Sequence, residues 1–331
     1  MRPFAYARPD DPAEAVAALR EGEERSARFL GGGTNLVDLM KLGVERPEML
    51  VDVTHLGLDE IAETDAGGLS VGAAVTNSAL AADTRVRERY PVLSQALVNG
   101  ASGQLRNLAT VAGNLLQRTR CVYFQDVSKP CNKRHPGSGC PAREGEHRNL
   151  AVLGHSAHCI ATHPSDMAVA LTALDTQVHV LGVDGPRSLV LSDLYRLPGE
   201  HPERETTLAA GELITAIELA PLAAASNSRY VKVRERRSYA FALVSVAAAL
   251  ELTADGTIAQ VRLALGGVAP VPWRAVRAQD ALRGARPDAE AFRAALDAEL
   301  EAAEPLAENA YKVTLVRDTA VRALLDLSEA A

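Results

Sequence analysis

The stretch RFLGGGTNLVDLMK, residues 28–41, places three consecutive glycines between a short strand and an amphipathic helix. Leu36, Leu39 and Met40 recur at helical spacing after the glycines. No Cβ atom covers the backbone N–H groups of such a loop, and the helix start adds partial positive charge. The loop therefore suits a diphosphate, and a glycine-rich tight turn without a ligand is the alternative.

Two common nucleotide motifs do not fit this loop. Gly33 is followed by Thr-Asn, so there is no Walker A lysine, and Leu36 breaks the G-x-G-x-x-G pattern. A second polar, glycine-bearing loop, QLRNLATVAGNLLQR at 104–118, also leads into an apolar turn, and we expect a strand–loop–helix unit around 109–114. Two such loops could hold the two ends of one long ligand.

The order of elements predicts an α+β fold rather than a regular βαβ array. A composition break at 221–229 separates off a C-terminal part, in which we expect an antiparallel sheet of three strands and three helices. The expected strands are Tyr230–Val233, Ala242–Leu252 and Ile258–Gly266, and the expected helices lie around 275–284, 288–302 and 312–328. The predicted divisions are 1–55, 56–222 (with an insertion at 118–160) and 223–331.

The cysteines of the chain are confined to one segment. Cys121, Cys131, Cys140 and Cys159 are its only four, spaced C-x9-C-x8-C-x18-C. The segment is rich in Gly, Pro, Arg and His and poor in apolar runs, so it cannot order itself by burial alone. Four thiolates from separate loop stretches suit a [4Fe–4S] cluster, and the lack of a C-x2-C pair argues against a zinc ribbon. Zinc, disulfides and unrelated free thiols are the alternatives.

Composition narrows the class of protein. The 331 residues are 47% hydrophobic and 23% charged, as in ordinary globular chains, and a net charge of −7 argues against nucleic acid as the main partner. The N-terminal residues show no apolar signal region, so we expect a cytoplasmic protein, or a periplasmic one exported with a signal-bearing partner.

Six stretches in order along the chain resemble the FAD-binding subunit of the molybdenum hydroxylase (xanthine dehydrogenase) family. They are LGGGTNLVDLMK (30–41), RNLATVAGNL (106–115), HPSDMAVAL (163–171), GELITAIEL (211–219), YVKVRERRSYAFALVSVAAAL (230–250) and LGGVAPVPWR (265–274). The resemblance implies a two-part FAD-binding domain of the vanillyl-alcohol oxidase type, followed by a C-terminal domain like that of CO dehydrogenase flavoproteins.

The resemblance also implies which residues contact FAD. The diphosphate would lie on Gly31, Gly32, Gly33, Thr34, Asn35 and Leu36, with further contacts at Thr110, Gly113, Asn114, Asp166, Ile214 and Lys232. Tyr239, just after a basic run, is a candidate neighbour of the isoalloxazine ring, and a core or interface tyrosine is its alternative.

Within the family, a subset carries a cysteine-rich insertion that binds a [4Fe–4S] cluster. CNKRHPGSGC followed by HCIATHPSD resembles the periplasmic aldehyde oxidoreductases, which implies that all four cysteines are ligands. A chain with a flavin and a cluster is expected to relay electrons, since a flavin handles two electrons and a cluster one.

The implied assembly is a heterotrimer with a molybdopterin-binding large subunit, which oxidises the substrate, and a small subunit with two [2Fe–2S] clusters. This chain would pass electrons to an external acceptor, and we predict no catalytic residue of substrate oxidation in it. A self-contained FAD oxidase of the vanillyl-alcohol oxidase type and a zinc-stabilised non-catalytic subunit are the alternative functions.

Overall fold

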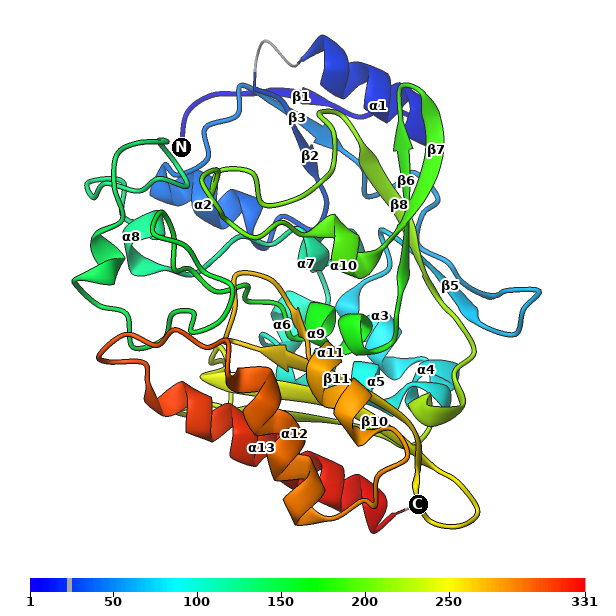
Figure 1. The fold of residues 1–331 in the computed structure, drawn as a ribbon. Coiled ribbons are helices and arrows are strands. Elements are labelled where there is room, and N and C mark those ends of the chain that lie inside the picture. The colour runs from blue at the N-terminus through cyan, green and yellow to red at the C-terminus, as the bar shows by residue number, and fades with distance from the viewer. Residues whose placement is uncertain (23–25, 331) are drawn as a thin grey trace.

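The computed structural model describes residues 1–22 and 26–330, which fold around three sheets (Figure 1). The first sheet is parallel, in the order β1-β3-β2, and lies near the N-terminus with two helices. Its elements are β1 (Ala5–Ala7), α1 (Pro12–Glu21), β2 (Arg28–Leu30), α2 (Leu36–Leu42) and β3 (Met49–Asp52). Asp11 caps α1 by accepting from the Glu14 N–H, and Pro12 occupies the first turn.

The second sheet is antiparallel, in the order β4-β5-β8-β6-β7. Its strands are β4 (Ile61–Glu63), β5 (Leu69–Gly72), β6 (Gln177–Gly182), β7 (Gly185–Val190) and β8 (Leu213–Leu219). The helices between them are α3 (Asn77–Ala82), α4 (Thr84–Arg89), α5 (Pro91–Asn99), α6 (Gly103–Arg106), α7 (Val111–Leu115), α8 (Val122–Gln125), α9 (Asp166–Ala173) and α10 (Leu191–Leu194), with a 3-10 turn at Pro141–Arg143.

The third sheet is antiparallel and has four strands, in the order β12-β11-β10-β9. After a 3-10 turn at Ala223–Ala225, it contains β9 (Ser228–Val233), β10 (Val244–Leu252), β11 (Ile258–Gly266) and β12 (Trp273–Arg274), and the helices that follow are α11 (Val276–Leu282), α12 (Ala289–Leu300) and α13 (Tyr311–Ser328). The prediction of three strands was therefore one short, because β12 has only two residues and too little sequence to show a period.

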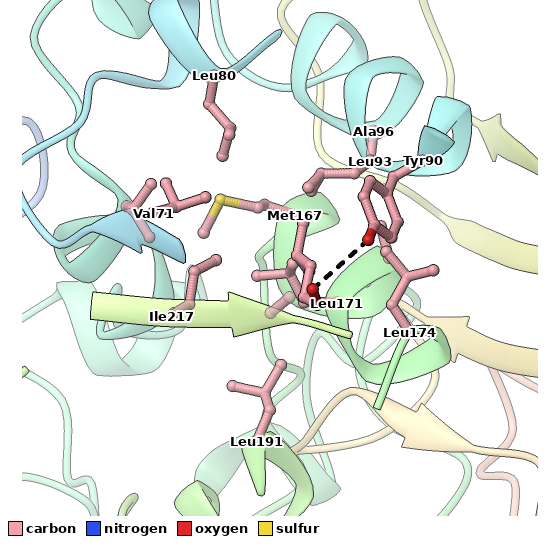
Figure 2. Packing of buried hydrophobic residues seen from close by; sticks show 14 of the residues in the cluster. Val71, Leu80, Tyr90, Leu93, Ala96, Met167, Leu171, Leu174, Leu191 and Ile217 are labelled. Carbon is pink, nitrogen blue, oxygen red and sulfur yellow. Dashed lines mark hydrogen bonds between the residues drawn. The ribbon is translucent and has the colours of Figure 1, made fainter. Parts of the chain in front are cut away.

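The helix α9 forms the centre of the molecule. Every residue from Met167 to Ala173 is buried, because α9 packs against α5, β10 and β11 and contributes to the main core. In Figure 2, Met167 and Leu171 of α9 face Val71 of β5 and Ile217 of β8. A helix that is apolar all round is expected at such a place.

The strand β10 is covered on both faces. Val244, Val246, Ala248 and Leu250 belong to the core shared with α11–α13, whereas Ala247 points to the core shared with α9. This explains a continuous apolar run where a one-sided strand would alternate.

Two further observations concern expectations and the membrane. The unit expected around 109–114 contains α7, but the strand before it is wrong: Thr110 makes only an isolated bridge to Thr76 before its backbone enters the helix. In the part of the chain that the structure describes, no helix is long and apolar enough to cross a membrane.

Candidate functional site

The two glycine-bearing loops pack directly on each other. A Cβ atom on Gly32 would lie 1.7 Å from the backbone oxygen of Leu108, and one on Gly31 would lie 2.9 Å from the Thr110 hydroxyl. Thr110 is held in turn by accepting a hydrogen bond from the Gly113 N–H. The glycines are therefore required by the close approach of the second loop, whatever the ligand.

A cleft of about 300 Å³ opens beside these loops. It combines exposed loop backbone with an apolar wall from three segments, formed by Phe29, Leu58, Leu213 and Ile214 among others. The predicted residues that line it are Gly31, Gly32, Gly33, Thr34, Asn35, Leu36, Thr110, Gly113 and Ile214. The structure thus brings together nine of the predicted cofactor-binding residues.

The cleft fits the cofactor that the sequence suggests. The Asn35 side chain accepts from the Arg118 N–H at 2.9 Å, but its Nδ2 is buried and has no partner in the chain. A buried donor without a partner is costly, which favours a ligand acceptor at this place. Glycine backbone for a diphosphate and an apolar wall for a ring system are the features that FAD requires.

Asn114, Asp166 and Lys232 lie behind this cleft. Asn114 accepts from the Ser165 hydroxyl at 2.6 Å and so joins α7 to the start of α9. The Lys232 ammonium lies 2.8 Å from Asp166 Oδ2, and the Tyr230 hydroxyl donates to Asp166 Oδ1 at 2.6 Å. Burial and the Asp166 carboxylate both raise the pKa of Tyr230 well above its usual value, so it stays a donor.

Tyr239 takes a different position. Its side chain is 57% exposed, its φ is +52°, and the Arg236 guanidinium lies 5.6 Å from its ring centre. Residues 240–243 line a cavity of about 260 Å³ together with Asp166, whereas Tyr239 does not. Its proximity to a flavin ring stays a prediction.

A polar cavity of about 290 Å³ joins the other two. It shares Arg28, Glu45 and Arg118 with the first cleft and the segment 162–164 with the 260 Å³ cavity. The sequence gave no sign of it. The three spaces form one continuous route through the middle of the chain.

Charged side chains fill one wall of this polar cavity. Arg118 pairs with Glu45, and its Nε lies 2.5 Å from Glu205 Oε2. Glu205 Oε1 accepts in turn from Lys133 Nζ at 2.9 Å. Burial alone would raise the pKa of Glu205, but the Lys133 and Arg118 cations outweigh it and hold that pKa below its usual value.

His163 and Tyr195 form the opposite wall. Their rings meet edge to face at 4.6 Å, and the Tyr195 hydroxyl donates to the Leu115 carbonyl. Burial lowers the pKa of His163 to about 4, against an opposing effect of Glu205, so the ring is neutral at pH 7. Its Nε2 is buried and has no partner.

The four cysteines converge on one small cavity. Cys121, Cys131, Cys140 and Cys159 all line it, together with apolar side chains such as Phe124 and Ala161, and all four are free thiols. The two-disulfide alternative therefore does not hold in this structure. Burial raises the pKa of Cys121 to about 11 and also raises that of Cys140 and Cys159, where the Lys133 ammonium opposes it.

The arrangement of these thiols bears on the kind of metal centre. Among residues 1–22 and 26–330, no three His, Cys, Asp or Glu side chains are grouped closely enough to hold a single metal ion. Four thiolates around one zinc are close neighbours, whereas each thiolate of a cube cluster binds a different iron. Four thiols that share a cavity without meeting at one point match the second donor set better in number and type.

The cysteine segment is also held by hydrogen bonds, a point that the sequence did not reveal. Asn132 bridges the segment, since its Nδ2 donates to the His158 carbonyl and its Oδ1 accepts from the Gly139 N–H. Arg134 donates to three carbonyls of the same segment. The order of this loop region therefore does not depend on a metal alone.

The C-terminal part of the chain closes over the segment. The His147 ring accepts from the Glu308 N–H, Asn309 donates to the Ala151 carbonyl at 3.1 Å, and Lys312 Nζ donates to the carbonyls of 149 and 150 at 3.0 Å. Leu306 packs against the apolar group that contains the cysteines.

Comparisons with known proteins agree with this geometry. Residues 2–222 match the family described as the FAD binding domain in molybdopterin dehydrogenase, and residues 229–327 match the CO dehydrogenase flavoprotein C-terminal domain. The chain is 52% identical to the aldehyde oxidoreductase FAD-binding subunit PaoB of Escherichia coli (strain K12), over 98% of both chains. It is 26% identical to the carbon monoxide dehydrogenase medium chain of Hydrogenophaga pseudoflava, over 97% of this chain and 96% of that one.

Solved structures show the same fold. A chain of reconstituted CO dehydrogenase from Oligotropha carboxidovorans superimposes with a TM-score of 0.77 at 25% identity, covering 100% of both chains. A chain of quinoline 2-oxidoreductase from Pseudomonas putida 86 gives a TM-score of 0.75 at 25% identity, covering 100% of this chain and 98% of that one. The predicted fold class and family are thereby confirmed, and the chain belongs to the FAD-binding oxidoreductase subunits of the molybdenum hydroxylase family.

Proposed function

We propose that this chain is the electron-transfer subunit of a heterotrimeric molybdenum-cofactor aldehyde oxidoreductase, holding one FAD and one [4Fe–4S] cluster. Its partners are a molybdopterin-binding large subunit and a [2Fe–2S] small subunit, and its product is a reduced external acceptor. The relative at 52% identity, an aldehyde oxidoreductase FAD-binding subunit, supports the substrate class and the assembly.

One observation supports the cluster above all others. The four thiols of the chain, brought from positions up to 38 residues apart, line a single cavity in an apolar setting. Lys133 lines this cavity as well as the polar one that adjoins the glycine-loop cleft. The two proposed cofactor sites are therefore neighbours, as one-electron transfer between them requires.

The residues of the chain have separate roles in this proposal. The glycine loop supplies backbone donors to the diphosphate, Ile214 and Leu213 exclude water from the ring side, and Asn35 Nδ2 gives a further donor. The four cysteines would hold the cluster as thiolates. FAD, when bound, supplies the capacity to take two electrons and release them singly.

The compartment is proposed on the same basis. The chain is expected to remain in the cytoplasm, or to reach the periplasm folded in complex with a partner subunit that carries the export signal. Fractionation of cells that express all three subunits, with this chain followed by immunoblot, separates these outcomes.

The deciding experiment is an anaerobic absorption spectrum of the full chain with iron, zinc and flavin measured on the same sample. About four irons and one FAD per chain are expected. Zinc in place of iron overturns the cluster. Flavin with no iron, together with oxidation of an aldehyde by the chain alone, favours the self-contained oxidase instead.

A further inference from the structure

The polar cavity contains a chain of alternating charges that runs from one proposed cofactor site to the other. Arg28 and Arg118 line the glycine-loop cleft, and Lys133 lines the cysteine cavity. Glu45 links the first two cations, with Arg28 Nε 3.7 Å from its carboxylate, and Glu205 links Arg118 to Lys133. Five residues from four segments thus make one connected series.

Lys133 is the member most enclosed by the protein. Its side chain is only 8% exposed, and its ammonium donates to the Pro202 carbonyl at 3.0 Å as well as to Glu205. A buried cation keeps more of its field than a solvated one, because the surrounding medium screens it less. The position of this ammonium is fixed by two acceptors rather than left to a flexible surface chain.

The partner Glu205 decides how much of that field is felt. Its two carboxylate oxygens are divided between the two sites, with Oε2 bound by Arg118 and Oε1 by Lys133. Loss of this carboxylate would leave both cations less compensated, one at each site. No other carboxylate is recorded in an ion pair with Lys133 among the described residues.

We propose that Lys133 raises the reduction potential of the metal centre in the cysteine cavity, and that Glu205 sets the size of this effect while linking it to the flavin cleft. The inference rests on the proposed cluster. Reduction adds negative charge to a cluster, so a fixed neighbouring cation favours the reduced form and raises the potential. Lys133 and Glu205 are positioning residues here, since neither is a ligand.

The test is an EPR-monitored redox titration of the assembled complex. Lys133→Met is expected to lower the midpoint potential of the iron centre in this chain and to change that of the flavin less. Lys133→Arg should restore the potential because it keeps the charge. Glu205→Gln should move the iron potential in the opposite direction, upwards, and should raise the flavin potential too.

Controls separate this effect from a loss of structure. Lys129→Met, at an exposed lysine of the same segment, should leave both potentials unchanged. If Lys133→Met lowers iron content, the double variant Lys133→Met/Glu205→Gln removes the unpaired buried carboxylate, and its potential should lie between those of the single variants. Equal potentials in all variants overturn the inference, whereas an unsubstituted complex without iron in this chain overturns the proposed function and the inference with it.

Discussion

The Lys232 ammonium and the Asp166 carboxylate form an ion pair of 2.8 Å between β9 and the first residue of α9, with side chains 1% and 9% exposed. Both were predicted separately as cofactor contacts, and the structure shows that they are partners of each other. The pair fastens the C-terminal sheet to the central helix beside the 260 Å³ cavity that Asp166 lines.

Breaking this pair should strongly destabilise the chain. Asp166→Asn leaves a buried ammonium without its counter-charge, and we expect a loss of about 3–5 kcal/mol in the free energy of unfolding, measured by urea denaturation. The exposed pair of Arg277 and Glu301 is the matched control, and Glu301→Gln should cost less than about 1 kcal/mol. Equal effects in the two variants would show that the Asp166 pair is not effectively buried.

Substitution of Gly32 should abolish flavin binding. A Cβ atom there would lie 1.7 Å from the Leu108 carbonyl oxygen, so Gly32→Ala must push the two loops apart. We expect at least about a tenfold weaker FAD affinity, measured by flavin fluorescence, together with a lower Tm. Gly103→Ala is the control, because its Cβ would meet no atom within 4 Å, and it should bind FAD normally.

Loss of one cysteine should remove the metal centre and spare the flavin. Cys140→Ser keeps the shape of the side chain but removes one of the four thiols that line the cavity. We expect iron content and the visible absorbance of the cluster to fall, with FAD content largely retained. Ser128→Ala, on the exposed part of the same segment, should change neither. Full iron content in Cys140→Ser contradicts the four-ligand assignment.

His163 should make the chain sensitive to acid. Its folded-state pKa of about 4 lies below the ordinary value of 6.5, so the unfolded chain binds more protons between these pH values. The free energy of unfolding therefore falls as the pH drops from 6.5 towards 4, by at most about 3 kcal/mol from this group. Thermal unfolding over this range should show a weaker pH dependence in His163→Gln, and the exposed His135→Gln should behave like the parent.

The residues at element junctions were the ones that the sequence predicted well. Gly31–Leu36, Thr110 and Gly113 gather in one cleft because a glycine loop between a strand and a helix has few ways to fold. Ile214 joins them from β8, and only the family resemblance pointed to it. The alternation and apolar runs of β9, β10 and β11 were also readable in the sequence.

The pairings between distant residues could not be predicted in the same way. Glu205 lies 87 residues from Arg118 and 72 from Lys133, and none of the three stands in a motif or a periodic pattern. The partner of a buried charge depends on which segments the fold brings together, and local sequence carries no signal of that. The exposed position of Tyr239 was missed for the same reason.

The contacts between 147–150 and 308–312 have a consequence for the order in which the protein is made. The ribosome completes the whole cysteine segment well before it reaches the residues that close over it. A nascent chain thus carries its thiols without their cover, and the cover arrives with almost the last residues synthesised. Maturation of the metal centre therefore has a natural time window, which begins when Cys159 emerges and ends when α13 docks.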